Sequence, residues 1–464
     1  MPSGDTVRRL RILALQTPAA QGSGAGEGTR VLRTQHFRKG ATMMTSTHKK
    51  PNAAQRRPLS ARWLARIALL AAVASVPQAA HAALAEAWGA NGDGELGNGT
   101  TTNSSVPTAV TGLSSGVTAI AAGSGQSLAV QNGGVYAWGY NDYGQLGNGT
   151  TTNSSVPIAV TGLSSGATAI AGGYSHSLAI QNGGAYAWGD NNYGQLGNGT
   201  TTNSPTPVAV TGLSSGVTAV AGGNSHSLAV QTGGVYAWGY NSTGQLGNGT
   251  TNNSSTPVVV TGLSSGVTAI AAGYAYSLAV QNGGAYAWGF NQFGNLGNGT
   301  TNTSTTPVAV TGLSSGVTAI SAGYGHGIAV QNGGVYAWGE NDYGQLGDGT
   351  TNNSLTPERI DATDLHNIIA VAAGYESSYA LSSDGSLWVW GDNGDGELGL
   401  GSSTGDYLTP QHLLPPSGYV FTSISTEIES DDALATLAAV PEPRSAGLVA
   451  VAGGLLLLGR RRRA

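Results

Sequence analysis

A tryptophan-glycine pair recurs along this chain at an almost constant spacing. Six pairs begin 50 residues apart, at Trp88, Trp138, Trp188, Trp238, Trp288 and Trp338, and a seventh begins 52 residues later, at Trp390. A repeat of this length is typical of propellers and of linear arrays, in which each unit buries its apolar surface against its neighbours. The spacing therefore predicts seven similar units and argues against a chain of unrelated domains.

Each unit contains short apolar runs separated by turn residues. In the clearest unit the pattern Asn-x-x-Gly-Gln-Leu-Gly-Asn-Gly-Thr spans residues 141–150, Pro157 follows, and two apolar runs end at Ile170 and Ile180. Such runs between Gly, Asn and Pro indicate antiparallel strands, and no helical period occurs outside the two terminal segments. With 74 glycines and no cysteine in the chain, we predict an all-β fold without disulfides, thiolate metal sites or a cysteine nucleophile.

The first and last units are incomplete in a complementary way. Residues 84–88 correspond to the end of a unit, whereas residues 433–437 resemble the earlier strand at 177–180 but lack a following Trp-Gly pair. We therefore predict that strands from both ends of the folded region complete one sheet, which closes the ring and removes the free sheet edges.

The repeated motifs A-W-G-x-N-x-x-G-Q-L-G-N-G-T and A-G-G-Y-S-H-S-L-A resemble the regulator of chromosome condensation repeat, over residues 83–440. The resemblance implies a seven-bladed β-propeller of about 50-residue repeats. A kelch propeller is the alternative because of pairs such as Gly133-Gly134, but kelch repeats lack the Gly-Gln-Leu-Gly-Asn-Gly-Thr signature. The tryptophan-aspartate repeat fits less well, because each Trp here precedes Gly or, at Trp388, Val.

The amino-terminal segment has the order of a secretory signal peptide. Four arginines precede the apolar run 67–76, and Ala80 and Ala82 provide small residues at the spacing of a signal peptidase site. We predict a signal peptide over 43–82 with cleavage after Ala82. Residues 1–42 show no periodicity, and we interpret them as an over-extended, disordered start. A buried helix is the alternative for the apolar run.

The carboxy-terminal segment resembles the PEP-CTERM sorting tail of Gram-negative bacteria. Pro441, Glu442 and Pro443 precede an apolar stretch over 446–458, which is short for a membrane span, and the arginine cluster Arg460, Arg461, Arg462 and Arg463 follows. For the tail 441–464 the resemblance implies transient anchoring in the inner membrane, recognition by an exosortase and release to the cell surface or the exopolysaccharide matrix. An ordinary anchor helix held by its arginines is the alternative.

Charge is distributed unevenly along the chain. Between residues 83 and 440 there are 21 Asp and Glu residues against the single Arg359, a net charge of −20, and 16 of these acidic residues lie from Glu340 onward. We expect the negative charge to gather in the last blades. A body of this charge repels phosphate backbones, so we predict no nucleic-acid partner.

The sequence offers no convincing catalytic or metal-binding constellation. His176, His226 and His326 occupy equivalent places in three units, so a propeller spreads them around its axis, and we interpret them as structural hydrogen-bonding residues. The oxygen-rich segment 392–397 lacks a ligand at the third position of a calcium loop and aligns with the ordinary turn at 90–95. We therefore predict a non-enzymatic protein with no catalytic residues, no cofactor and no metal.

The nearly identical units differ mainly at two places, one after Trp-Gly and one after Ala-Gly or Gly-Gly. Aromatic side chains on the loops of a rigid scaffold commonly form recognition surfaces; the alternative is that they pack between blades. The candidate ligand face comprises Tyr140, Tyr143, Tyr174, Tyr193, Tyr240, Tyr274, Phe290, Phe293, Tyr324, Tyr343 and Tyr375.

These observations lead to one functional hypothesis and two alternatives. The hypothesis is an exported binding or structural module of a Gram-negative cell surface, with a polysaccharide or a surface protein as partner. A propeller that binds proteins as an inhibitor is the first alternative, because the resemblance extends to a secreted β-lactamase inhibitor of the same architecture. Guanine-nucleotide exchange is implied only by analogy with the family's eukaryotic founder, and the export signals argue against it.

Overall fold

The computed structural model describes residues 83–360, 365–426 and 431–440. The predicted signal peptide with Ala80 and Ala82, the segment 1–42 and the sorting tail 441–464 lie outside these residues. Within them the chain forms 28 strands and no helix. The strand bounds are β1 Leu84–Gly89, β2 Ser104–Ala109, β3 Val117–Ala122, β4 Gln126–Gln131, β5 Gly134–Gly139, β6 Ser154–Ala159, β7 Ala167–Gly172, β8 His176–Gln181, β9 Gly184–Gly189, β10 Ser204–Ala209, β11 Val217–Gly222, β12 His226–Gln231, β13 Gly234–Gly239, β14 Ser254–Val259, β15 Val267–Ala272, β16 Tyr276–Gln281, β17 Gly284–Gly289, β18 Ser304–Ala309, β19 Val317–Ala322, β20 His326–Gln331, β21 Gly334–Gly339, β22 Ser354–Arg359, β23 Ile368–Ala373, β24 Ser377–Ser382, β25 Leu387–Gly391, β26 Tyr407–Leu413, β27 Tyr419–Thr426 and β28 Asp432–Ala439.

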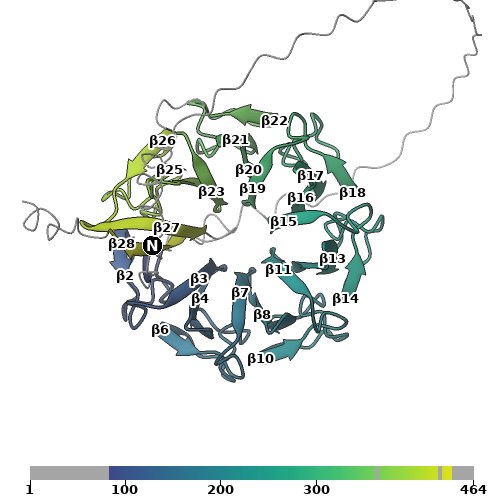
Figure 1. The fold of residues 1–464 in the computed structure, drawn as a ribbon, viewed down its shortest axis with the longest axis horizontal. Coiled ribbons are helices and arrows are strands. Elements are labelled where there is room, and N and C mark those ends of the chain that lie inside the picture. Colours follow the sequence, from purple (N-terminus) through teal and green to yellow (C-terminus); the bar gives the residue numbers. More distant parts are fainter. Residues whose placement is uncertain (1–82, 361–364, 427–430, 441–464) are drawn as a thin grey trace, which may run out of the picture. The chain divides into compact units, whose positions relative to one another are not determined.

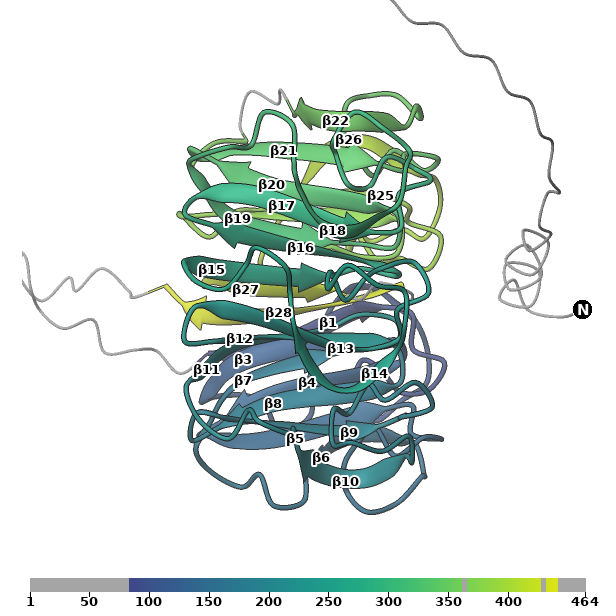
Figure 2. The same cartoon turned by 90° about the vertical axis from the view of Figure 1, so that its right-hand side faces the viewer.

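The strands form seven four-stranded antiparallel sheets arranged as the blades of a ring (Figures 1 and 2). Six blades use four consecutive strands, whereas the seventh has the order β2-β1-β28-β27. In this closure blade Trp88 lies opposite Ala433 and Leu84 opposite Leu437. The predicted seven-bladed propeller, closed by strands from both ends, is therefore confirmed.

Tight turns set the register between the second and third strands of five blades. Between β4 and β5, Asn132 and Gly133 have φ values of 51° and 81°, which is the backbone of a type I′ hairpin turn and suits the twist of antiparallel strands. The same Asn-Gly pair, or Thr232-Gly233 in one blade, recurs at this turn in the next four repeats. The innermost strands of all seven blades together line an axial cavity of about 230 Å³.

The recurring tryptophans join neighbouring blades. Trp188 on β9 is fully buried and packs with Leu128, Val130 and Leu146 of the preceding blade. Its indole ring approaches Gly147 so closely that a Cβ there would lie 2.7 Å from Trp188 Nε1. A glycine is therefore required at that position, where φ is also positive, at 69°.

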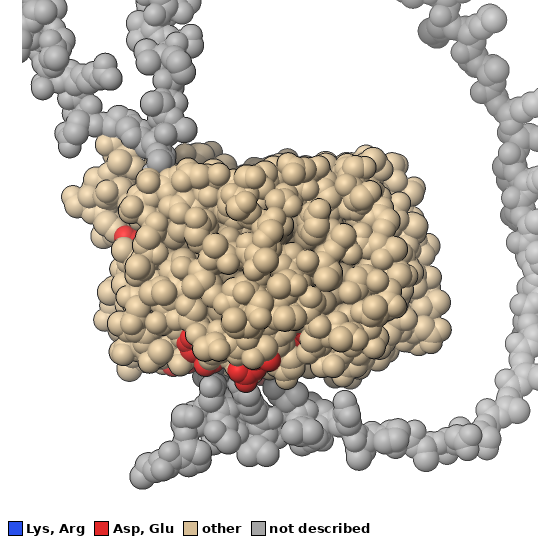
Figure 3. Space-filling model, turned by 90° about the horizontal axis from the view of Figure 1, so that it is seen from below, with Lys and Arg blue, Asp and Glu red and all other residues tan. Residues whose placement is uncertain are grey.

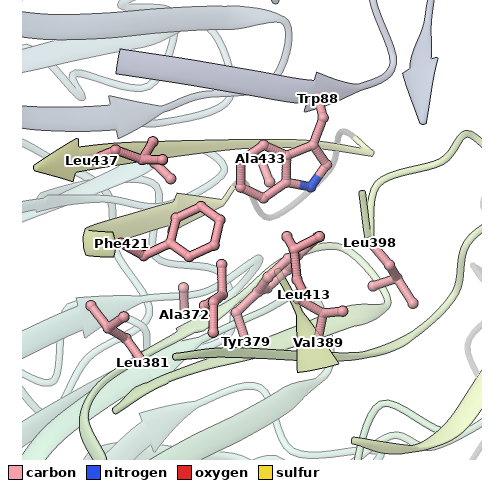
Figure 4. Packing of buried hydrophobic residues seen from close by; sticks show 12 residues of the cluster. Trp88, Ala372, Tyr379, Leu381, Val389, Leu398, Leu413, Phe421, Ala433 and Leu437 are labelled. Atoms are coloured by element: carbon pink, nitrogen blue, oxygen red, sulfur yellow. The ribbon is translucent and has the colours of Figure 1, made fainter. Parts of the chain in front are cut away.

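The same arrangement holds at the closure. Figure 4 shows Trp88 and Phe421 of the closure blade facing Leu413, Tyr379 and Val389 of the preceding blade. The Trp88 and Phe421 ring centroids are 6.4 Å apart. Residues from the two ends of the folded region thus share one apolar core, and burying it stabilises the closed ring.

A buried asparagine organises the long loop that follows each Trp-Gly pair. The Asn141 side chain is fully buried; its amide donates to the carbonyls of Thr150 (3.1 Å) and Thr152 (2.9 Å), and its Oδ1 accepts from Leu146 N (2.9 Å). These bonds satisfy backbone groups of a loop without regular structure. The repeated Asn-x-x-Gly-Gln-Leu-Gly pattern therefore encodes loop geometry.

Acidic residues gather where the sequence predicts. Blades β11–β14 and β15–β18 contain none, whereas the blades from β19 onward and the closure blade contain all the described ones except Asp142 and Asp190. Figure 3 shows carboxylates clustered along one edge of an otherwise almost uncharged surface.

Among the residues that the structure describes, no helix could span a membrane.

Candidate functional site

Both groups of variable loops lie on the same face of the propeller. In each blade one loop joins the first strand to the second and another joins the third to the fourth; Tyr140 N, in the second kind of loop, donates to Gly125 O, in the first kind (2.6 Å). The pairing of Gln126 with Gly139 places these two loops at the same ends of their strands. We call the surface formed by these loops the loop face.

All eleven predicted aromatic residues are on the loop face, and none is buried. Tyr143 and Tyr193 are 38% and 43% exposed, and the other nine are half-buried. Aromatic rings held at a surface in this way retain a face or an edge for a ligand. The loop face therefore carries a set of accessible aromatic rings.

The rings contact one another across blade boundaries. Tyr324 lies between Tyr274 and Tyr375, with centroid distances of 4.7 and 5.0 Å, and each of the three belongs to a different blade. Because their loops follow the innermost strands that line the axial cavity, this row borders the mouth of the cavity. A second contact between blades joins Tyr193 and Tyr240, at 4.7 Å.

Three histidines connect consecutive blades beneath this surface. His176 Nε2 lies 2.9 Å from Ser227 Oγ in the next blade, and Ser227 Oγ donates to Gln195 O (2.8 Å). Since the only hydroxyl proton of Ser227 is used in that bond, His176 must donate through Nε2–H. The same contact recurs for His226 with Ser277 and for His326 with Ser378, both at 2.9 Å. The interpretation of these histidines as structural is confirmed.

Burial keeps these imidazoles neutral. It lowers the pKa of His176 to about 4 and that of His226 to about 3, because a charged ring would lose its hydration. For His226 the neighbouring His176 lowers the pKa further. The two rings are fully buried and their Nδ1 atoms have no hydrogen-bond partner among the described residues, so neither can act as an accessible general base.

In the two blades that lack this serine, a tyrosine hydroxyl of the preceding blade makes a different hydrogen bond. Gly327 replaces the serine, and in the blade before it Tyr276, in place of a histidine, reaches with its hydroxyl to His326 O. At the closure Ala433 replaces the serine, and the Tyr379 hydroxyl donates to Glu397 O instead (2.6 Å). The Tyr276 hydroxyl therefore keeps a contact between blades, whereas the Tyr379 hydrogen bond lies within the blade β23–β26.

Three carboxylates meet on the loop face where the last continuous blade, β23–β26, adjoins the closure blade. One oxygen each of Asp392, Glu397 and Asp431 lies within 4.8 Å of the others. Asp392 and Glu397 are 2% and 1% exposed. Burial, followed by the charges of Asp431 and Asp392, raises the pKa of Glu397 well above its ordinary value.

Sequence reasoning missed this cluster. The comparison with a calcium loop covers only the contiguous segment 392–397, whereas Asp431 comes from a distant segment that precedes β28. The available signal is the alignment of units, in which Asp431 occupies the place of Ser175. The structure supports this alignment, because Ala90 N donates to Asp431 O in the same way as Asp190 N donates to Ser175 O. This position holds Gly, Ser or Ala in the five units from Gly125 to Gly325 and a carboxylate only in the last two, at Glu376 and Asp431, which is the detectable change.

A family model described as RCC1-like domain matches residues 85–428. This match covers six of the seven blades completely and reaches into the closure blade. The chain belongs to the RCC1-like domain family. A search of curated proteins finds no match to this RCC1-like propeller.

Solved structures share the fold of this RCC1-like propeller. Human WBSCR16 is 25% identical, covering 77% of this chain and 99% of that one with a TM-score of 0.68. Prp20p from Saccharomyces cerevisiae is 22% identical over 81% of this chain and 96% of that one, with a TM-score of 0.70. The yeast RCC1 (Prp20) chain bound to Kap60 is 21% identical over 86% and 97%, with a TM-score of 0.68. Such propellers act as binding or exchange modules, which agrees with the expectation of a binding protein.

Proposed function

We propose that this RCC1-like propeller is exported to the surface or extracellular matrix of a Gram-negative bacterium, where its loop face binds a polysaccharide. The observation that carries the binding proposal is the gathering of all eleven variable aromatic residues on one face, each at least partly exposed. Aromatic faces stack on sugar rings, and a rigid ring of blades holds them without an ordering cost at binding.

The surroundings of the aromatic residues suit a neutral ligand. Loops of the first four continuous blades are rich in Asn, Ser and Thr and contain few charges, with Asp142 and Asp190 as the acidic residues of these blades. Neutral hydroxyl and amide groups can bond to sugar hydroxyls without displacing a counter-ion. The ring contact between Tyr193 and Tyr240 lies in this part of the ring, and Tyr193 is the more exposed of the two.

A protein partner is the second candidate, and the acidic part of the loop face favours it. The described carboxylates concentrate in the blades from β19 onward and in the closure blade, so a basic protein surface would complement them. The fold is shared with Prp20p, a protein whose structure is reported with its binding to Gsp1p and histones. An inhibitor-like interaction would use the same face, whereas nucleotide exchange rests on family analogy alone.

Glycan binding is tested with the full chain on an array of neutral and amino-sugar oligosaccharides and in pull-down from exopolysaccharide. Tyr193→Ala should weaken binding by about tenfold, corresponding to the roughly 1 to 3 kcal/mol of an aromatic stacking contact. Tyr193→Phe should retain most of it because the ring is kept. Val259→Ala is the matched control, since Val259 is 54% exposed on the outermost strand β14, away from the loop face.

The outcomes separate the candidates. Binding that survives Tyr193→Ala unchanged would refute the proposed face, and saturable binding of a purified basic protein without any glycan binding would favour the protein-binding candidate. Export is tested separately by deleting residues 440–464 and fractionating a bacterium that carries an exosortase. Unchanged fractionation would refute the sorting role of Pro441, Glu442 and Pro443.

A further inference from the structure

Among the three carboxylates Asp392, Glu397 and Asp431, the place of Glu397 is held in the blade β7–β10 by a neutral amide donor. In the blade β7–β10, Asp190 occupies the place of Asp392 and Gln195 that of Glu397; Gln195 Nε2 donates to Asp190 Oδ2 at 2.8 Å. At the closure a carboxylate replaces that amide. Two carboxylates cannot bond to each other without a proton or a cation between them.

Only one of the two oxygens of the buried Glu397 carboxylate accepts a hydrogen bond from the described residues. Its Oε2 accepts from Asp395 N (2.9 Å), but its Oε1 has no hydrogen-bond partner among the described residues, although Glu397 is only 1% exposed. A buried carboxylate oxygen without a donor is costly. Asp93 and Asp395 on the loop face do have side-chain donors, since they accept from Asn153 and Asn103 at 2.9 and 3.1 Å. Among the described residues, Glu340 Oε2 shares with Glu397 Oε1 the lack of a hydrogen-bond partner.

No basic side chain of the described residues can neutralise the cluster. Across residues 83–360, 365–426 and 431–440, Arg359 is the one Lys or Arg. Arg359 is the last residue of β22. The first residue of that strand, Ser354, pairs with Gly339 next to the loop face. Arg359 therefore lies on the other face of the propeller.

We propose that Asp392, Glu397 and Asp431 bind a calcium ion on the loop face, at the junction between the blade β23–β26 and the closure blade. An all-oxygen set of carboxylates suits a hard cation, and calcium accepts irregular coordination that includes carboxylates, backbone carbonyls and water. Two oxygens on opposite sides of Ca²⁺ are about 4.8 Å apart at the usual bond length of about 2.4 Å. All three oxygens lie within 4.8 Å of one another, so no pair exceeds the span that contact with one ion allows.

The ion would stabilise the closed ring at the junction between the blade β23–β26 and the closure blade. Asp392 and Glu397 lie in the loop after β25, whereas Asp431 immediately precedes β28 of the closure blade. Binding to carboxylates of both blades favours the closed ring over an opened one, because the ligands converge only when the ring is closed. This site does not depend on what the aromatic residues bind.

The test is calorimetric titration of CaCl₂ into the full chain after treatment with EGTA and removal of the chelator. The wild type should show one saturable site per chain, and Ca²⁺ should raise its midpoint of thermal unfolding by several degrees. Glu397→Gln should bind at least tenfold more weakly and lose the thermal shift. This variant restores the glutamine found at Gln145, Gln195, Gln245 and Gln345, so it should fold in EGTA at least as well as the wild type.

Asp190→Asn is the matched control, because it removes one carboxylate from the loop face without touching the cluster, and its calcium binding should equal that of the wild type. Asp431→Ser, which introduces the residue found at Ser175 and Ser225, should behave like Glu397→Gln. MgCl₂ should bind at least tenfold more weakly than CaCl₂. The proposal is overturned by the absence of saturable calcium binding, by unchanged binding in both cluster variants, by an equal loss in the control, or by equal affinity for magnesium.

Discussion

The buried tryptophans of two blade junctions donate to equivalent backbone carbonyls, but only one of these carbonyls also accepts from a serine hydroxyl. Trp188 Nε1 donates to Gln145 O at 2.8 Å, and Ser177 Oγ donates to the same carbonyl at 2.9 Å. Trp338 Nε1 donates to Asn295 O at 3.0 Å, but Gly327 stands where the serine would be. Within the described part of the chain, the Asn295 carbonyl therefore lacks the second side-chain donor that the Gln145 carbonyl has.

Changing each tryptophan to phenylalanine should therefore have unequal costs. Both indoles are fully buried, so both variants lose a similar ring volume and one hydrogen bond, at about 1 to 3 kcal/mol. After Trp188→Phe the carbonyl keeps its serine donor. After Trp338→Phe a buried carbonyl is left without a side-chain donor, which adds about 1 to 3 kcal/mol. Trp338→Phe should be the more destabilising by that amount.

Unfolding in guanidinium, monitored by far-UV circular dichroism, measures the free energy of unfolding of each variant without relying on tryptophan fluorescence. Equal losses would refute the argument that the missing serine decides the difference. A double-mutant cycle with Gly327→Ser sharpens the test, because a Cβ at Gly327 would lie 2.6 Å from Trp338 Cε2. The serine should destabilise the wild type but be tolerated better together with Trp338→Phe, because the smaller ring leaves room for it to donate to the Asn295 carbonyl.

Three further predictions concern stability. Because burial lowers the pKa of His226 to about 3 from the ordinary 6.5, stability should fall as pH drops from about 6.5 towards 3, by up to about 5 kcal/mol for this group; His226→Gln, which introduces the residue found at Gln126, should reduce that slope in acid denaturation. Because burial raises the pKa of Glu340 to about 7 from 4.5, its contribution should be lost as pH rises from about 4.5 through 7, by up to about 3 kcal/mol, and a pH series on Glu340→Gln that keeps the wild-type slope would contradict this. Asn241→Ala removes bonds to Thr250 O and Leu246 N in a loop core, so it should lower the unfolding free energy by about 2 to 4 kcal/mol in denaturant titration.

Several features of the fold can be predicted from short-range patterns in the amino-acid sequence. The spacing of the Trp-Gly pairs predicts the number of blades, because each blade is one repeat and each tryptophan packs against the blade before it. The incomplete units at 84–88 and 433–437 predict the closure, and β1 and β28 pair in that way, with Trp88 opposite Ala433. Strands and turns depend on neighbouring residues, so their pattern is local and can be recognised without the structure.

The contacts between blades were decided only by the tertiary structure. The pairing of His176 with Ser227 and the compensation of Gly327 by Tyr276 join residues about one repeat apart, at positions that no local pattern relates. The gathering of both aromatic groups on one face depends on the direction in which each strand ends. Asp431 reaches Asp392 and Glu397 only because the two ends of the folded region meet in one blade. Electrostatic and hydrogen-bond contacts act over a few ångströms in space, and the closure of the ring sets which residues come within that range.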